Sequence, residues 1–131
     1  MRFAKWVFLV AGVYGLLILA PGFFLEGAVG KSAPPAISHP EFYYGFYGSA
    51  MVWQVVFLVI ASNPAKYRAL ILVSVFEKLG FFAACLALYF TGRLAVSGPL
   101  FGSLIDGAWM VMFAIAWMTT RPKAVSGAEG G

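Results

Sequence analysis

Four long apolar runs dominate the chain, and short segments rich in Pro, Gly, Asn and Ser separate them. The runs cover residues 6–25, 42–62, 69–90 and 100–120. Each has about the 20 residues that an α-helix needs to cross roughly 30 Å of hydrocarbon. Backbone polar groups in lipid must be paired within their own segment, which only a helix achieves in a single run. The pattern therefore predicts an all-α fold, an antiparallel bundle of four transmembrane helices.

The connections between the runs predict how the helices follow one another. Asn63-Pro64 is a tight break, so the second and third helices should form an antiparallel hairpin. Ser97-Gly98-Pro99 breaks the chain before the fourth helix, and residues 26–41 are expected to form the one long loop. We expect a single membrane domain, residues 1–120, followed by a flexible cytoplasmic tail, residues 121–131, which is rich in Gly, Ala and Ser.

Basic residues near the ends of the runs predict the orientation. Two of them, Lys31 and Arg93, fall on one side of the membrane; the other side has six, Arg2, Lys5, Lys66, Arg68, Arg121 and Lys123. Because cytoplasmic segments carry the excess of Lys and Arg, both termini should be cytoplasmic, in the inner membrane if the source is bacterial. The first run could also be a cleaved signal peptide. A retained helix is favoured, because the run is longer than a signal-peptide core and lacks a clear A-x-A site.

Composition supports a membrane protein and argues against a nucleic-acid partner. Of the 131 residues, 62% are hydrophobic and 11% are charged, whereas soluble domains have about 45–50% and 25%. The net charge of +4 does not predict nucleic-acid binding, because the basic residues are spread over the ends of the runs and share no single surface. The lipid bilayer is the expected partner.

The residue types give little support for cofactor chemistry. The single cysteine, Cys85, excludes an intramolecular disulfide and a C-x-x-C motif, and it is expected to be a small buried hydrophobe. The single histidine, His39, excludes bis-histidine haem within one chain. His39 and Glu41 could bind a metal weakly, but a solvated loop is favoured. We expect neither a cofactor nor a metal site.

Four polar side chains lie well inside the apolar runs: Gln54, Glu77, Lys78 and Asp106. A charge at the middle of a bilayer costs on the order of 2.5–3.5 kcal/mol, so three unpaired charges would cost about 8–10 kcal/mol. These side chains should therefore face the bundle interior. Glu77 and Lys78 lie about 100° apart around their helix. We expect Glu77 to face inward and Lys78 to form a structural ion pair with Asp106 at a helix–helix seam, with the reverse arrangement as an open alternative.

Helical spacing places further residues beside the polar ones, and small residues next to a polar one are typical of close helix packing in lipid. The expected inward faces hold Tyr14 on the first helix; Tyr43, Tyr47, Ala50 and Gln54 on the second; Ser74, Glu77, Gly80, Phe81 and Ala84 on the third; and Gly102, Ser103, Asp106, Trp109 and Met110 on the fourth. From these faces we predict a ligand-binding site made of Tyr14, Tyr47, Gln54, Glu77, Asp106 and Trp109. The aromatic run FYYGFYG, residues 42–48, is expected to be an interfacial belt, with a pocket mouth as the alternative.

The polar cluster admits other interpretations. Lys78 and the two acids could simply lock the helices together, or they could form a proton or ion path. An open cavity of about 300 Å³ or more beside Glu77 and Asp106 would favour a ligand or catalysis. A filled centre in which Lys78 bridges the acids would favour a structural role.

Residues 42–78 carry a resemblance to known proteins. The segments FYYGFYGSAMVWQ and FLVIASNPAKYR, the helix with Glu77-Lys78 and the later helix with Asp106 resemble a group of small bacterial four-helix membrane proteins that have no settled function. The arrangement is more distantly similar to DoxX-like proteins and to the EXPERA group, which includes emopamil-binding sterol isomerase and the sigma-2 receptor. That resemblance implies a bundle whose buried carboxylates bind cationic or sterol-like molecules.

The resemblance extends to residue types and not to a full motif. Glu77, Asp106 and Trp109 match the EXPERA site in type, but the histidine expected of the isomerase is missing, since His39 lies in a predicted loop. Small multidrug transporters are similar in size, but they have an essential glutamate in their first helix. The first predicted helix of this chain, residues 6–25, contains no glutamate.

Taken together, the sequence predicts a non-enzymatic bundle that binds a hydrophobic small molecule or serves as an accessory subunit of a larger membrane complex. One alternative is an isomerase-like enzyme that uses Glu77 and Asp106 as acid and base on a lipid or sterol-like substrate. Another is a small transporter, which would require a homo-oligomer.

Overall fold

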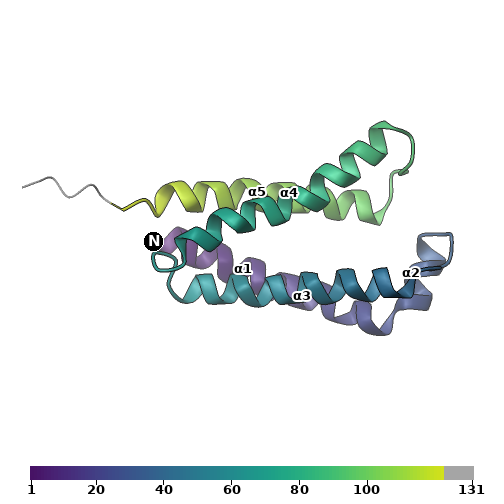
Figure 1. Ribbon diagram of the computed structural model, residues 1–131, viewed down its shortest axis with the longest axis horizontal. Coiled ribbons are helices and arrows are strands. Elements are labelled where there is room, and N and C mark those ends of the chain that lie inside the picture. The colour runs from purple at the N-terminus through teal and green to yellow at the C-terminus, as the bar shows by residue number, and fades with distance from the viewer. Residues whose placement is uncertain (123–131) are drawn as a thin grey trace, which may run out of the picture.

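The computed structural model describes residues 1–122 and consists of helices joined by short connections. The elements in order are α1 (Arg2–Leu19), the 3₁₀ helix η1 (Ala20–Phe24), α2 (Glu26–Ser32), α3 (Pro40–Ser62), α4 (Arg68–Phe90) and α5 (Gly98–Thr119). The four long helices run in alternating directions along the long axis of the molecule (Figure 1). The predicted all-α fold with four antiparallel long helices is confirmed. Most of the predicted tail, residues 123–131, lies outside the described residues.

The long helices have the length and composition of membrane spans. The first candidate span, Arg2–Phe24, combines α1 with η1, and each of the four spans has 22 or 23 residues with a mean hydropathy between 1.6 and 2.2. At about 1.5 Å per residue, a 23-residue helix is roughly 34 Å long, which matches the hydrocarbon thickness. These features are those of an integral membrane protein.

Local chemistry explains where the helices begin and end. Pro40 and Pro99 lie in the first turn of α3 and α5, where the missing N–H group of proline costs nothing. Pro21 marks the change from α1 to η1. In the turn between α3 and α4, the side-chain carbonyl of Asn63 accepts a hydrogen bond of 3.1 Å from the backbone N–H of Lys66. The predicted helical hairpin is therefore present, with Asn63 closing its turn.

The prediction of one long loop over residues 26–41 is wrong in its first half, because Glu26–Ser32 forms the short helix α2. The segment EGAVGKS has two glycines and no clear apolar face, so its pattern does not indicate a helix. Glu26 lies in the first turn and Lys31 in the last, an arrangement that suits the helix dipole. The helix matters for the site because it lies beside the open end of the bundle (Figure 1).

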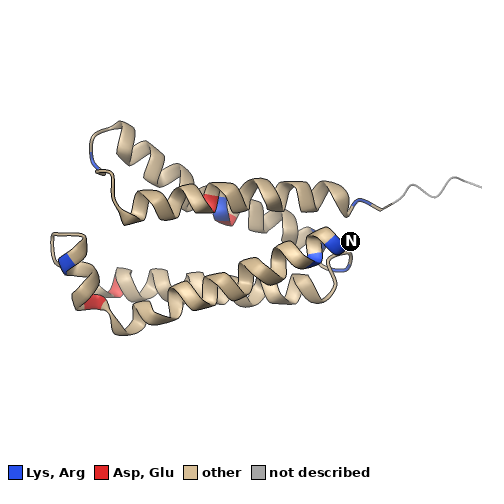
Figure 2. Cartoon of the chain, turned by 180° about the vertical axis from the view of Figure 1, so that it is seen from behind, with Lys and Arg blue, Asp and Glu red and all other residues tan. Residues whose placement is uncertain are grey.

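The long helices are arranged as two antiparallel pairs, α1 with α3 and α4 with α5 (Figure 1). The pairs lie close together at the end that contains the N-terminus and the α3–α4 turn, and they separate towards the end that contains α2 (Figure 1). Lys and Arg residues gather at the N-terminal end, and fewer lie at the other (Figure 2). This is the distribution from which the sequence predicts cytoplasmic termini, and the orientation stays a prediction.

The apolar core lies at the closed end of the bundle. Phe8, Phe57 and Phe113 are fully buried, and their ring centroids are 4.2 to 5.8 Å apart. They come from α1, α3 and α5, and Ile71 adds the buried contribution of α4. Aromatic rings at this spacing pack edge to face or offset, which fixes the mutual position of the helices. The core therefore holds the two pairs together at one end and leaves the middle of the bundle to other residues.

Two glycines allow the chain before α3 to approach that helix closely. A Cβ atom at Gly15 of α1 would overlap the side-chain amide of Gln54, and one at Gly22 of η1 would overlap the ring of Tyr47. The hydroxyl of Tyr43 also donates a hydrogen bond of 2.6 Å to the carbonyl of Gly22. Small residues at helix contacts are typical of packing in lipid, where backbones must come close to gain dispersion energy. These contacts fix Gln54 and Tyr47 against the first span.

Candidate functional site

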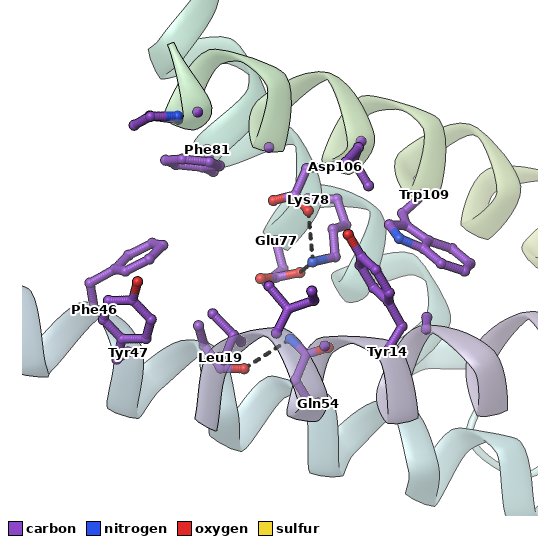
Figure 3. Close-up of a pocket in the computed structure, with 18 of the residues that line it drawn as sticks. Tyr14, Leu19, Phe46, Tyr47, Gln54, Glu77, Lys78, Phe81, Asp106 and Trp109 are labelled. Atoms are coloured by element: carbon purple, nitrogen blue, oxygen red, sulfur yellow. Dashed lines mark hydrogen bonds and ion pairs between the residues drawn. The ribbon is translucent and has the colours of Figure 1, made fainter. Parts of the chain in front are cut away.

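A cavity of about 410 Å³ lies between the two helix pairs (Figure 3). Its size falls within the range of small-molecule sites, about 300–1,000 Å³. All four long helices and the segment around α2 contribute to its lining, which is mostly apolar. The polar and aromatic residues of its lining include Tyr14, Phe46, Tyr47, Gln54, Glu77, Lys78, Phe81, Asp106 and Trp109.

The structure brings every residue of the predicted ligand site to this one cavity. Tyr14 comes from α1, Tyr47 and Gln54 from α3, Glu77 from α4, and Asp106 and Trp109 from α5. The sequence predicts Gln54, Glu77 and Asp106 there because polar groups in lipid need shelter from acyl chains, and the three aromatic residues because of their position on the helices beside these polar groups. The cavity provides that shelter, because these side chains point between the helix pairs (Figure 3).

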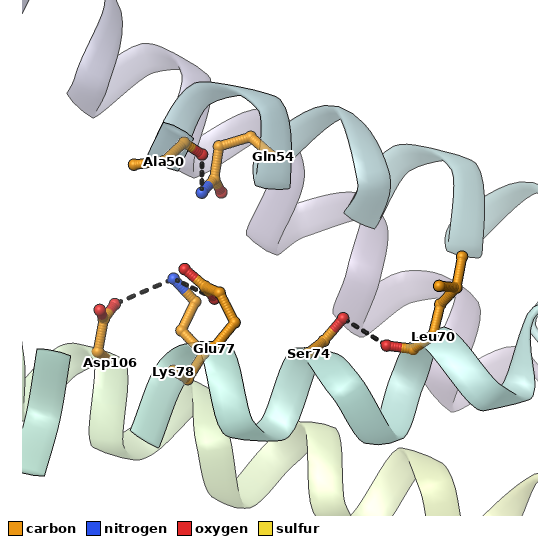
Figure 4. Close-up of polar contacts among 7 residues, drawn as sticks. All are labelled: Ala50, Gln54, Leu70, Ser74, Glu77, Lys78 and Asp106. Carbon is orange, nitrogen blue, oxygen red and sulfur yellow. Dashed lines mark hydrogen bonds and ion pairs between the residues drawn. The ribbon is translucent and has the colours of Figure 1, made fainter. Parts of the chain in front are cut away.

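The charged groups form one cluster with Lys78 at its centre (Figure 4). The ammonium of Lys78 lies 3.2 Å from Oδ1 of Asp106 and 3.6 Å from Oε2 of Glu77. The side chains are 8% (Lys78), 18% (Glu77) and 22% (Asp106) exposed. The Lys78–Asp106 pair expected from the sequence is therefore present, and Glu77 joins it. Two carboxylates share one ammonium, so acidic groups are in excess.

Lys78 also connects the charged cluster to the aromatic core. Its ammonium lies 5.3 Å from the centroid of the Phe57 ring, a distance at which a cation is attracted to a ring face. One turn earlier on α4, the hydroxyl of Ser74 donates to the carbonyl of Leu70 at 2.7 Å (Figure 4). The polar cluster therefore borders the packed aromatic core.

Glu77 has acceptor capacity that the protein does not use. Within residues 1–122, neither oxygen of its carboxylate accepts a hydrogen bond: Oε2 is buried 3.6 Å from the ammonium of Lys78, and Oε1, which keeps some exposure, is the atom that a ligand can reach. A buried acceptor without a donor costs about 1–3 kcal/mol. Glu77 lines the cavity as well, so a donor or cation placed there would find an acceptor already fixed in position.

Gln54 is held mainly by its own helix. Its side-chain nitrogen donates to the carbonyl of Ala50 at 2.9 Å, and the residue is 3% exposed (Figure 4). The close approach of Gly15 limits the room that this amide has to move. Gln54 therefore presents a fixed amide to the cavity on the side opposite Glu77 and Asp106 (Figure 3).

Aromatic rings form much of the remaining wall. The rings of Tyr14 and Trp109 lie 6.1 Å apart between α1 and α5, and those of Phe46 and Phe81 lie 5.6 Å apart between α3 and α4. Part of the aromatic run at residues 42–48 belongs to the cavity wall, as the pocket-mouth alternative expects, and the interfacial belt stays a prediction. Phe46 and Tyr47 line the cavity, whereas Phe42 is 70% exposed on the outside of the bundle.

The rotation of α4 differs from the one expected. Gly80 and Ala84 were predicted on the inward face with Glu77, but both are exposed, and a Cβ at Gly80 would touch nothing. The buried positions of the helix are Ile71, Ser74, Lys78 and Cys85. The inward face is therefore centred on Lys78, with Glu77 at its edge. Spacing alone could not distinguish the two, because neighbouring residues each fit a helical stripe.

Sequence reasoning also missed part of the cavity wall. Val29 and Ser32 of α2 line it at the open end, together with Pro99 of α5. No signal in the sequence pointed to α2, because its segment looks like a loop. Phe46 could have been found, because it lies one turn before the predicted Ala50 on the same side of α3.

The remaining candidates for metal or redox chemistry lie apart from the polar cluster or have no suitable neighbours. His39 and Glu41 form a 3.2 Å pair at the start of α3, where both side chains are largely exposed. Cys85 is a buried free thiol. Within the described part of the chain, no three His, Cys, Asp or Glu side chains form a group that could hold a metal ion.

No family model, curated protein or solved structure matches this chain. The resemblance to DoxX-like and EXPERA proteins therefore stays an expectation.

Proposed function

We propose that the protein is a membrane receptor or carrier for an amphipathic small molecule, whose polar head binds at Glu77 and Asp106 and whose apolar part fills the cavity. The observation that carries this proposal is the cavity of about 410 Å³ directly beside a sheltered charged cluster. A purely structural ion pair would need no such space. Close packing is the rule in protein interiors, and voids much larger than a water molecule are few.

The charges indicate the kind of head group. Glu77 and Asp106 outnumber Lys78, and Glu77 has an unused acceptor atom. A ligand with a protonated amine or another hydrogen-bond donor would balance the cluster, whereas an anionic head would add a further negative charge. The rings of Tyr14 and Trp109 face the same space and would attract a cation. We therefore favour a primary or secondary amine as the head group.

The bridging position of Lys78 supports a ligand site that is fixed in advance. The ammonium holds Asp106 at 3.2 Å and lies beside Glu77, so neither carboxylate has to reorganise when a ligand arrives. Binding sites gain affinity when their polar groups are already ordered. In this proposal Lys78 positions the acids, and Glu77 contacts the ligand.

Equilibrium binding of radiolabelled dodecylamine tests the proposal. The protein is reconstituted in phosphatidylcholine nanodiscs, and binding to empty nanodiscs is subtracted. Loss of one charge-assisted hydrogen bond costs about 1.5–3 kcal/mol, so Glu77→Gln should weaken binding by about 10- to 150-fold. Circular dichroism and thermal unfolding establish that the variant still folds.

The matched control is Glu41→Gln, which removes the same charge from an exposed position at the start of α3. Its affinity for dodecylamine should equal that of the wild-type protein. Equal affinities of the wild-type protein and a folded Glu77→Gln variant would contradict the proposal, as would an equal loss in both variants. Uncharged dodecanol should bind more weakly than dodecylamine to the wild-type protein.

A further inference from the structure

A second, smaller hollow opens between α3 and α4. Its volume is about 290 Å³, and its lining consists of Phe46, Ser49, Ala50, Trp53, Glu77 and Phe81. Ser49, Ala50 and Trp53 follow Phe46 by three, four and seven residues and so share one face of α3, and Phe81 follows Glu77 by four on α4, so the hollow runs along both helices. It is more open than the main cavity and lies on the lateral surface of the bundle, the surface that meets acyl chains in a membrane protein.

The lateral hollow is continuous with the main cavity in its lining. Phe46, Ala50, Glu77 and Phe81 belong to both. Phe46 and Phe81 face each other across the gap at 5.6 Å between ring centroids (Figure 3). Glu77 is the charged group at the junction, and its neighbours on the lateral side are aromatic or small. A molecule in the hollow would therefore meet its first charged partner at Glu77.

The bundle is open at this place because α3 and α4 pack weakly against each other. Each of them packs extensively with another helix, α3 with α1 and α4 with α5, so the two are held at their shared turn and separate beyond it (Figure 1). Where α3 and α4 separate, the side of the bundle leaves space that an acyl chain can enter.

We infer that the ligand is a single-chain amphiphile dissolved in the membrane, which reaches the site sideways between α3 and α4. Its head lies at Glu77, the part of its chain next to the head fills the main cavity, and the rest of the chain runs through the lateral hollow into the bilayer. This inference rests on the proposed function and adds the class of ligand and its route. The aromatic walls suit a hydrocarbon chain, and one narrow hollow between two helices suits one chain.

The competing route is through the end of the bundle. The main cavity extends to Val29, Ser32 and Pro99, which lie next to the connections on the α2 side. A water-soluble ligand would enter there and leave its apolar part against those residues. The two routes therefore differ in which residues the chain of the ligand touches, and a chemical cross-link can distinguish them.

Photo-cross-linking with a hexadecylamine that carries a diazirine at mid-chain tests the inference. The full-length protein in phosphatidylcholine nanodiscs is irradiated, and labelled residues are mapped by mass spectrometry. Labels should fall on Phe46, Ser49 and Trp53 of α3 and on the facing part of α4. Unlabelled hexadecylamine in excess should suppress them, and Glu77→Gln should reduce them at least about tenfold.

A substitution in the hollow provides the second measurement. Ser49 is exposed and lines only the lateral hollow, so Ser49→Trp should occlude it without disturbing the core. Labelling and dodecylamine affinity should fall at least about tenfold. Val55→Trp is the matched control, because Val55 is an exposed residue of the same helix that lines neither cavity. It should behave like the wild-type protein.

The outcomes separate the two proposals. Labels that depend on Glu77 but fall on Val29, Ser32 and Pro99, with no effect of Ser49→Trp, would overturn the lateral route and leave the proposed function standing. Labelling that is unaffected by Glu77→Gln, or absent altogether, would overturn both. Labels spread evenly over all lipid-facing helices would show that the hollow has no preference for the chain, which also overturns the inference.

Discussion

Removal of the central ammonium from the charged cluster should destabilise the bundle. Lys78→Met removes the ammonium that lies between Asp106 and Glu77 and keeps a side chain of similar length. The two carboxylates then face each other in a sheltered site without a counter-charge. We expect a clear loss of stability, because Lys78 is one of the most buried residues of α4 and its removal leaves two sheltered carboxylates without a counter-charge.

The magnitude follows from the two distances. At 3.2 and 3.6 Å, and with an effective dielectric constant of about 20, each ion pair has a Coulomb energy of about 5 kcal/mol. Desolvation of the ammonium offsets most of that gain, and measured losses on breaking a buried pair are about 3–5 kcal/mol. Proton uptake by one carboxylate would relieve part of the repulsion. The expected destabilisation is therefore about 3 kcal/mol.

The assay is equilibrium unfolding in lipid bicelles for a double-mutant cycle. The variants are Lys78→Met, Asp106→Asn and the double substitution, with Lys66→Met as the exposed control. The loss of unfolding free energy in the double variant should be smaller, by at least about 1 kcal/mol, than the sum of the losses in the two single variants, because substitutions at residues in direct contact do not have additive effects. Lys66→Met should change stability by less than about 0.5 kcal/mol.

A Lys78→Met variant as stable as the wild-type protein would refute the reasoning, because the ammonium would then contribute nothing that methionine cannot replace. Strictly additive stability losses in the double-mutant cycle would also refute the reasoning, because they would show that Lys78 and Asp106 do not interact in the membrane.

Two further predictions concern the fold and its orientation. Phe57→Ala should destabilise the bundle by about 2 kcal/mol in the same unfolding assay, because lipid solvates phenylalanine well and only the packing and cavity contributions are lost. Phe42→Ala, at an exposed ring, should have almost no effect on stability, and equal effects of the two substitutions would contradict the position of the core. In a Cys85→Ala background, a membrane-impermeant maleimide added to intact cells should label Val96→Cys in the α4–α5 connection and leave Lys66→Cys in the α3–α4 turn unlabelled. The opposite labelling would reverse the orientation.

Much of this structure could be predicted from the sequence, for a reason specific to membranes. Hydrocarbon imposes a helix length and forbids unpaired backbone groups, so the four long spans follow from hydropathy alone. The same cost makes Gln54, Glu77, Lys78 and Asp106 conspicuous, and their gathering around one cavity follows from the need to avoid lipid. Soluble proteins tolerate exposed charges and give no such signal.

The inward face of α4 and the cavity could not be predicted, because they depend on how several helices pack against one another. The face of α4 is centred on Lys78 because Ile71 and Ser74 fit against the aromatic core, and their fit is decided by the other helices. The cavity exists because the α1–α3 and α4–α5 pairs separate above that core, and the separation depends on how four helices pack at once. Helix α2 could not be predicted because its seven residues carry no periodic pattern of apolar positions.

The central claim is that Glu77 holds the polar head of a bound amphiphile. Native mass spectrometry of the protein released from its own membranes tests it most directly, by weighing what stays attached. Wild-type protein and Glu41→Gln should both carry an adduct of one small amphiphile, and a folded Glu77→Gln variant should have lost it. An adduct retained in full by Glu77→Gln, or wild-type protein that carries none, would contradict the account.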